Sequence, residues 1–539
     1  MKSALAHIKR GQNINAMINH QQQVNGALTS EAPAATTNGD NYVLAWTEAD
    51  QSIWWITCPA STNQNSYDWE KKIQILGAAS SGGPALANLN GHIWMVWKGE
   101  NADTRIFIGS LKGSKWNLIG PISGIATSSA PALTSSGSEL FLAWKGESDN
   151  QIYWSKSSDG KVWNAAPGNV QAQVPGAVST DSPALAGYNG TVYLAWKGGG
   201  SAGQGMIWAS WTAAGWGKPS AIFVGNLSDM GPALGVGDTG NVHLALKSIT
   251  RSTIWTAVWT PANKQWSSIA IIPVVQTDER PSLASQASAS TDVLLAWKGA
   301  STSDVWAGPL NALINQPVNY SFSVQQINII TQRSRNTESD TLYMTITVAV
   351  GSKPTIKKTF SLGEHHHGDV FSGDWSVLAS VADDEKVVMS YVIINHGGSS
   401  TSAEILSTLE SAGDTLAKAA IAVYATEASI AIGALANVVL PGFGAVVIPL
   451  LDSALIAVGD WLLSEVVGLF SLISPDCDGP VAAGVHAYTG SQLKKGTGTP
   501  GGAISFTTAV DNCVGVNSPK GCGDNSLYDI NWDILGLYP

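Results

Sequence analysis

The chain has 539 residues, only 13% of them charged, and a net charge of −11 from 29 Lys and Arg against 40 Asp and Glu. This length is too great for one hydrophobic core, so we expect two or three domains. The acidic charge, which no basic cluster offsets, argues against binding of nucleic acid through its phosphates. The first residues, MKSALAHIKRGQN, lack the apolar core of a signal peptide, so we expect a cytosolic protein or one released by another route.

A block of about fifty residues recurs six times between Pro33 and Asn315. Each block opens on a proline and continues with an alternating apolar run that ends in Trp-Lys-Gly or a relic of it, as in TVYLAWKG at 191–198. A second short run with a central aromatic residue follows, and in five blocks a further Trp follows that. Short strands with this period are typical of propeller blades, each of which is a four-stranded sheet.

The sixth block lacks an outer strand after Trp306, whereas a segment at 21–29 precedes the first block where such a strand belongs. The pattern therefore predicts a mainly β chain whose residues 1–315 form a six-bladed β-propeller, closed by the N-terminal strand. A closed ring leaves only short, protected sheet edges.

Nineteen of the 22 Trp lie between residues 46 and 306. A Trp at the same phase of every blade fills the space between sheets, and we prefer this interpretation for the Trp-Lys-Gly residues. The aromatics of the second run lie beside turns, where a flat ring and nearby polar groups suit a sugar. The candidate glycan-binding residues are Trp54, Trp154, Trp208, Trp255 and Trp306, the repeated Lys98, Lys145, Lys197 and Lys298, and the acidic Glu100 and Glu147.

Two stretches, SPALAGYNGTVYLAWKG at 182–198 and SSDGKVW at 157–163, carry a resemblance to known propellers. The chain from about residue 30 to 310 resembles sialidase-like and fucose-lectin-like propellers, which implies the fold and recognition of sugars. SSDGKVW is similar to the Asp-box of sialidases, a structural turn, but lacks the residue between Asp and Gly. Sialidases grip the substrate carboxylate with three arginines; only Arg105, Arg251 and Arg280 occur here, outside that family's arginine motif, so we expect no sialidase activity.

Residues 316–539 have a different character. Strand-like runs cover about 319–397 and return near the end of the chain, while 402–473 is rich in Ala, Leu, Ile and Val with helical spacing, interrupted by LPGFG at 440–444. This pattern predicts a β-sandwich-like domain with an inserted apolar α-helical hairpin at about 402–473.

The expected hairpin has few charges. Residues 428–451 include none, residues 419–493 include no Lys or Arg, and the acidic residues expected to matter are Glu427, Asp452, Asp460 and Glu465. Protonation of these carboxylates would lower the barrier to entering a bilayer, which predicts an acid-triggered, membrane-active segment. The alternative is a hairpin packed permanently against the sandwich.

The remaining motifs carry less chemistry. None of the cysteines has the paired spacing of a zinc site; Cys477, Cys513 and Cys522 are candidates for one disulfide. EHHHGD at 364–369 is expected to be a turn, because adjacent strand residues cannot all face one ion. The closing GCGDNSLYDINWDIL resembles the end of uncharacterised secreted bacterial and fungal proteins.

These observations together predict a lectin-like protein that binds glycans and acts on lipid membranes through its C-terminal domain, as a pore-forming, insecticidal or defence toxin. We expect no catalytic residue, cofactor or metal, an extracellular working place after cytoplasmic storage, and oligomers on membranes. Two alternatives remain: a glycoside hydrolase or other carbohydrate-active enzyme, which needs a carboxylate pair in a pocket, and a non-enzymatic adhesion or structural protein.

Overall fold

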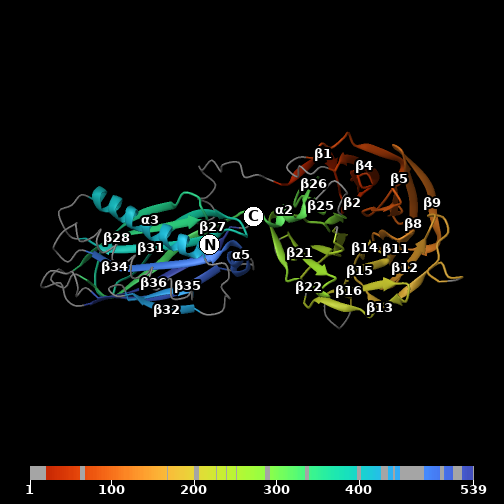
Figure 1. Cartoon of the computed structure of the whole chain (residues 1–539). Coiled ribbons are helices and arrows are strands. Elements are labelled where there is room, and N and C mark those ends of the chain that lie inside the picture. The colour runs from red at the N-terminus through yellow and green to blue at the C-terminus, as the bar shows by residue number, and fades with distance from the viewer. Residues whose placement is uncertain are drawn as a thin grey trace. The chain divides into compact units, whose positions relative to one another are not determined.

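The computed structural model of the protein describes residues 20–537 except 61–66, 167, 200–204, 226, 238, 250–251, 286–291, 334–338, 397–401, 427–434, 441–443, 450–478, 498–502 and 514–524. The chain is mainly β and divides into two compact units, Met1–Gln316 and Pro317–Tyr538 (Figure 1). Each unit is described by itself below.

Six small antiparallel sheets make up the described part of the first unit. The first three, each from its inner to its outer strand, are β2 (Ala34–Thr37), β3 (Asn41–Thr47), β4 (Ser52–Pro59) and β5 (Ile73–Ala79); β6 (Ala85–Leu89), β7 (His92–Lys98), β8 (Arg105–Lys112) and β9 (Lys115–Ala126); and β10 (Ala132–Ser136), β11 (Glu139–Lys145), β12 (Gln151–Ser157) and β13 (Ala172–Val178). The next two are β14 (Ala184–Tyr188), β15 (Thr191–Lys197), β16 (Met206–Thr212), β17 (Gly215–Trp216) and β18 (Ser220–Phe223); and β19 (Ala233–Val236), β20 (Val242–Lys247), β21 (Thr253–Thr260), β22 (Gln265–Trp266) and β23 (Ala270–Gln276).

The sixth sheet joins the two ends of this unit. Its strands β24 (Ser282–Ala284), β25 (Leu294–Lys298) and β26 (Asp304–Pro309) are completed by β1 (Gln22–Leu28), which runs antiparallel to β26 with Gln22 opposite Ala307. The short helix α2 (Leu310–Ile314) follows. Each inner strand contacts the inner strand of the next sheet, and β24 contacts β2, so the inner strands form a ring. Small sheets arranged in this way are consistent with propeller blades.

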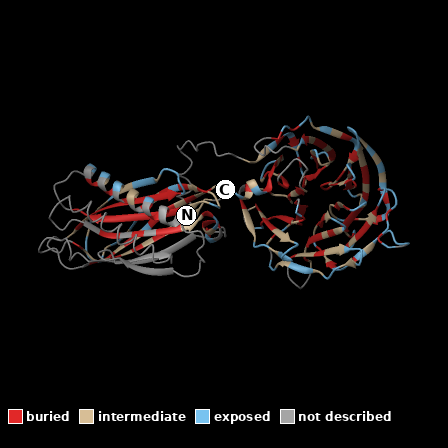
Figure 2. Ribbon diagram, viewed as in Figure 1, coloured by how far each residue is buried: buried red, intermediate tan, exposed pale blue. Residues whose placement is uncertain are grey.

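The repeated Trp residues fill the space between neighbouring sheets. Trp46, Trp144, Trp196 and Trp297 are at most 1% exposed. Figure 2 shows buried residues along the inner strands and exposed residues at the outer rim. Because one sheet cannot bury both of its faces, this packing against neighbours stabilises every sheet in the ring.

Two four-stranded sheets form the described core of the second unit. Their strand orders are β30-β27-β36-β35 and β29-β28-β31-β34. The bounds are β27 (Val318–Thr331), β28 (Asp340–Val350), β29 (Ile356–His365), β30 (Val370–Val381), β31 (Lys386–Asn395), β34 (Gly479–Thr489), β35 (Ala503–Cys513) and β36 (Asn525–Gly536), with the short helix α5 (Gly490–Thr497) after β34. Alternate residues of the strands, such as Tyr320, Phe322 and Trp532, meet in one buried core.

A 25-residue helix, α3 (Ser402–Thr426), packs on β28 and β31. Gly413 permits the close approach, because a Cβ atom there would lie 2.6 Å from Thr347 Oγ1. The chain then forms two antiparallel strands, β32 (Leu435–Leu440) and β33 (Gly444–Pro449), rather than a second helix.

The predicted helical hairpin at 402–473 is therefore not confirmed. Within the described residues of this range, the first arm is helical, and the β-branched residues on both sides of LPGFG lie in two paired antiparallel strands, since Val and Ile pack well on a pleated sheet. Residues 450–473 of the predicted second arm lie outside the described residues.

Candidate functional site

The repeated lysines hold loops of the first unit together. Lys98 and Lys145 donate hydrogen bonds to Ser81 Oγ and Ser128 Oγ, each at 2.7 Å. Lys298 Nζ lies 2.6 Å from Asp278 Oδ1, and Lys197 donates to the Asp229 carbonyl oxygen at 2.9 Å. Each partner lies in a loop that precedes the first proline of a block. These bonds give all four lysines a structural partner, and their use as sugar ligands stays a prediction.

The aromatics predicted to bind sugar occupy two different positions in their sheets. Trp54 and Trp306 lie opposite the Trp of the preceding strand, and Trp255 lies opposite Leu246. Trp154 and Trp208 lie one residue later, opposite Ala143 and Ala195. A shift of one residue moves a side chain to the other face of its sheet.

The residues equivalent to Trp54 in the third and fourth sheets are therefore Tyr153 and Ile207. Trp154 is buried and packs edge-on against Trp216, with ring centroids 5.8 Å apart. Trp208 packs against Trp259 with centroids 4.4 Å apart. The structure thus places Trp154 and Trp208 among aromatic packing contacts between sheets.

Polar side chains surround Trp54 in the first sheet and join the first sheet to the second. Lys72 Nζ lies 4.5 Å from the ring centroid of Trp54 and 2.6 Å from Glu48 Oε1. Between the first and second sheets, the Gln51 side chain accepts from the Asn101 backbone N–H at 2.8 Å and donates to Asn101 Oδ1 at 3.2 Å. Glu100 beside Asn101 is exposed.

A pocket of about 590 Å³ opens between the second and third sheets. The second sheet contributes Arg105 and residues 121–126 of β9, and the third contributes Trp144, the loop 146–149, Tyr153 and nearby Gln171. Thr104 Oγ1 joins the two sheets beside the pocket by donating to Glu147 Oε1 at 2.9 Å. Of the acidic residues predicted to bind sugar, Glu147 lines this pocket.

The pocket offers an aromatic ring beside fixed donors and acceptors. Tyr153 stacks on Trp144 with ring centroids 6.1 Å apart and 20° between the planes. Its hydroxyl donates to Asp149 Oδ2 at 3.0 Å and accepts from Gln173 Nε2 at 3.2 Å. The buried indole N–H of Trp144 has no hydrogen-bond partner within the structure described here. The described structure gives no partner to the buried indole N–H groups of Trp69, Trp116, Trp196, Trp216 and Trp266 either, so this feature belongs to the packed tryptophans and does not by itself mark a ligand site.

An ion pair with Asp103 fixes the orientation of Arg105 at the rim of this pocket. Arg105 donates to Asp103 through Nε at 3.0 Å and Nη2 at 2.7 Å, and its guanidinium lies 5.2 Å from the ring centroid of Phe107. The hydrogen bonds from Arg105 hold the pKa of Asp103 below its ordinary value. Arg105 therefore stays pre-oriented at the rim with part of its donor set facing outward.

Sequence reasoning did not select Arg105 or Tyr153 as sugar-binding residues, although a local signal exists. Asp50, Asp103 and Asp149 each accept a hydrogen bond from the backbone N–H two residues later. The half-buried aromatic that lies opposite the Trp of the preceding strand follows each Asp by four residues: Trp54, Phe107 and Tyr153. This spacing reflects the turn that starts the strand, and it identifies the correct aromatic in these three blocks.

Several predictions concern residues beyond the described part of the chain. Glu427, Asp452, Asp460 and Glu465 lie there, as do Cys477 and Cys522, and the side chain of Cys513 is not described. Cys58 is a free, buried thiol whose pKa burial raises to about 12. In the described residues we find no helix long and apolar enough to span a membrane and no metal-binding group of His, Cys, Asp and Glu.

Comparison with known proteins gives similarity at the level of structure. No protein-family model matches the sequence, and no curated protein matches it significantly. Among solved structures, AofleA from Arthrobotrys oligospora is 12% identical with a TM-score of 0.39, over 67% of this chain and 92% of that one. The SapL1 lectin, solved with alpha methyl fucoside, is 14% identical with a TM-score of 0.39, over 53% of this chain and 94% of that one.

A third similar structure is an enzyme, the Hadza microbial sialidase Hz136. It is 12% identical with a TM-score of 0.38, over 53% of this chain and 66% of that one.

Proposed function

We propose that this protein is a glycan-binding, lectin-like protein whose first unit is a six-bladed β-propeller closed by β1. The pocket between the second and third sheets is the proposed binding site. A sugar ring presents apolar C–H faces and several hydroxyl groups, and the pocket provides an aromatic ring with charged and amide groups around it.

The half-buried ring of Tyr153, stacked on Trp144 beside two carboxylates, is the observation that carries this proposal. Glu147, Asp149 and Arg105 line the same pocket, so one sugar can lie on the ring, donate to a carboxylate and accept from the guanidinium. The fourth sheet provides a contrast, because Ile207 occupies the position of Tyr153 and offers neither an aromatic ring nor a polar group.

A glycan array probed with the full chain tests the proposal. We expect binding to one class of sugars, weakened at least about tenfold by Tyr153→Ala and by Arg105→Ala, since one lost bond of about 1.4 kcal/mol changes affinity tenfold. The matched control is Ile207→Ala, which alters the equivalent position in the fourth sheet, outside the pocket. A blank array from folded protein, or equal losses in Tyr153→Ala and Ile207→Ala, contradicts the proposal.

The second candidate function is action of the C-terminal unit at membranes, as a toxin or defence protein that assembles on lipid. The support is the apolar composition of 402–473 and the attachment of α3 through carboxylates. Thr359 Oγ1 donates to Glu410 Oε1 at 2.9 Å, Thr355 bonds Asp414, and Lys418 Nζ lies 2.6 Å from Asp414 Oδ2. Ile405 and Leu409 lie on the buried face of this helix.

Dye release from anionic liposomes tests this second function. We expect greater release at pH 5 than at pH 7, because protonated carboxylates enter a bilayer at lower cost. Absence of release at both pH values excludes it. We also propose that the protein acts outside the cell, after release without a classical signal peptide.

A further inference from the structure

The loop before the first proline of each block has one shared conformation. Its first residue is Ser or Thr, whose hydroxyl donates to the backbone carbonyl two residues later, as Thr29 does to Glu31 at 2.7 Å and Thr277 to Glu279 at 2.8 Å. The same bond recurs at Ser80, Thr127, Ser179 and Ser228. Equivalent positions in the six loops can therefore be compared directly.

Two positions in these loops carry charge. Two residues before the first proline, three of the six blocks have an acidic residue, Glu31, Asp181 or Glu279, and the other three have Gly82, Ser129 and Met230. Glu31 and Glu279 lie in adjacent sheets of the ring, whereas the Asp181 carboxylate accepts hydrogen bonds from the backbone N–H groups of Ser182 and Gly231. Directly before the proline, the sixth block has Arg280, where the other blocks have Ala32, Gly83, Ala130, Ser182 and Gly231.

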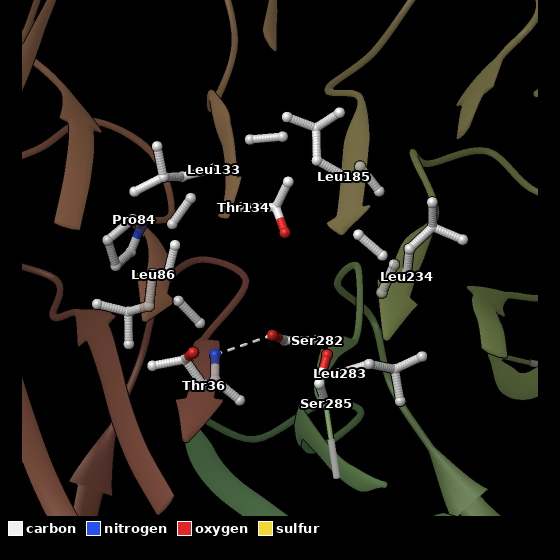
Figure 3. Close-up of a pocket in the computed structure, with 18 of the residues that line it drawn as sticks. Thr36, Pro84, Leu86, Leu133, Thr134, Leu185, Leu234, Ser282, Leu283 and Ser285 are labelled. Atoms are coloured by element: carbon white, nitrogen blue, oxygen red, sulfur yellow. Dashed lines mark hydrogen bonds between the residues drawn. The ribbon is translucent and has the colours of Figure 1, made fainter. Parts of the chain in front are cut away.

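Arg280 and the six prolines line the central pocket of about 260 Å³ within the ring, which Figure 3 shows in close-up. Small side chains such as Thr134, Ser282 and Ser285 also line it, from the inner strands. Arg280 reaches the fourth sheet, where Nη1 donates to the carbonyl oxygen of Pro183 at 3.1 Å. The guanidinium thus lies at the end of the pocket where the prolines stand.

These three charged groups lack the pairing seen elsewhere in the same loops. Lys247 pairs with Asp229 at 2.8 Å and Lys298 with Asp278 at 2.6 Å. By contrast, in the described structure the half-buried Glu31 and Glu279 carboxylates accept no hydrogen bond, and Arg280 makes only the bond to Pro183. Half-buried charges without hydrogen bonds are costly, which favours a ligand that satisfies them.

The mixed charge selects the chemistry of that ligand. A simple anion would approach Arg280 but be repelled by Glu31, Glu279 and nearby Asp181, and a cation would be repelled by Arg280 and Lys298. A neutral ligand with adjacent hydroxyl groups can accept from the guanidinium and donate to the carboxylates at the same time. The small pocket admits about one sugar ring.

We propose that Arg280, Glu31 and Glu279 form a second sugar-binding site, at the mouth of the central pocket and separate from the site between the second and third sheets. It rests on the proposed function in that both sites take sugars, but none of its three residues lines the first pocket.

Isothermal titration of the full chain with D-galactose, L-fucose, D-mannose, D-glucose and N-acetyl-D-glucosamine tests this site. Arg280→Ala is compatible with the fold, because Ala32 and Ala130 occupy the equivalent position in other blocks. Glu31→Gln keeps the shape of its side chain, and the matched control is Glu70→Gln, at an exposed residue that lines neither pocket.

We expect at least one sugar to lose about tenfold or more in affinity in Arg280→Ala and in Glu31→Gln, while Glu70→Gln and the first-pocket variant Tyr153→Ala still bind it. If every sugar that binds the wild type binds Arg280→Ala within twofold, the second site is excluded and the first stands. Loss of all binding in Tyr153→Ala assigns every sugar to the first pocket and likewise overturns the second site. Absence of binding by the wild type overturns both proposals, and melting curves of each variant verify that it is folded.

Discussion

Each of the two units buries ionisable groups whose pKa values burial shifts. In the first, burial raises the pKa of Glu279 to about 7, with the charge of Glu31 adding to the effect, and burial raises the pKa of Asp292 to about 6. In the second, complete burial lowers the pKa of His486 to about 3. The physical cause is the same in both units, since burial disfavours whichever form is charged.

Glu279 and His486 respond to acid in opposite directions. Folded Glu279 holds its proton between about pH 4.5 and 7, where an unfolded Glu releases it, so this group stabilises the first unit as pH falls through that window. Folded His486 stays neutral between about pH 6.5 and 3, where an unfolded His is protonated, so this group destabilises the second unit as pH falls. The buried His243 of the first unit, whose pKa burial also lowers, acts in the same direction as His486 and against Glu279, so the contrast holds between these groups and not between whole units.

The largest effect that separates the units is expected from deletion of residues 1–30. Val24 and Ala27 of β1 are buried in the core between the sixth and first sheets, and β26 would lose its partner strand. We expect the unfolding transition of the first unit to disappear while that of the second persists, measured by calorimetry. Deletion of residues 1–19 is the control, because it keeps β1; an unchanged melting temperature in the longer deletion contradicts closure by β1.

The next effect concerns His486, whose ring lies 3.8 Å from that of Trp532 and stacks near Tyr391 in the sandwich core. Its pKa shift corresponds to roughly 4 kcal/mol of stability lost between pH 6.5 and 3. We expect His486→Phe to flatten the pH dependence of the second unit's free energy of unfolding, measured with urea from pH 7 to 4. Equal slopes in variant and wild type would remove His486 as the cause.

Asp414 on α3 sets a limit to the acid response of the second unit. Burial alone would raise its pKa, but hydrogen bonds from Lys418 and Thr355 outweigh burial and hold the pKa below 3.8. The stability that these bonds provide is present above that pH and is lost only below it. Between pH 5 and 6, His486 therefore already lowers the stability of the second unit, whereas the hydrogen bonds that attach α3 through Asp414 weaken only at lower pH.

The sequence predicts the repeat well because period and turn residues are local signals. Strand register is less local: the loops after Trp144 and Trp196 differ in length, so Tyr153 and Ile207, rather than Trp154 and Trp208, lie opposite these two tryptophans. The stretch 435–449 is apolar in either interpretation, and periodicity cannot separate a short buried strand from a helix. The pockets were beyond prediction, because each combines residues from neighbouring sheets.

A smaller effect is expected at Glu279. The groups around it are Glu31, Asp278, Lys298 and Arg280, and its partial exposure screens them, so we expect Glu279→Gln to stabilise the first unit by about 1 kcal/mol at pH 8 and to have little effect at pH 5. Urea unfolding at both pH values measures this, with Glu100→Gln as the control. The same stabilisation at pH 5 as at pH 8 contradicts a role for the buried charge.

The smallest effect is expected from Lys247→Met in the fifth sheet. Lys247 is almost fully buried and pairs with the half-exposed Asp229, so we expect a loss of about 0.5–1 kcal/mol, visible as a small drop in the first unit's melting temperature. Lys247 occupies the repeated lysine position in the block that has no Trp-Lys-Gly, so its effect reports the structural value of that position alone. An unchanged melting temperature would instead favour the prediction that the other repeated lysines serve sugars.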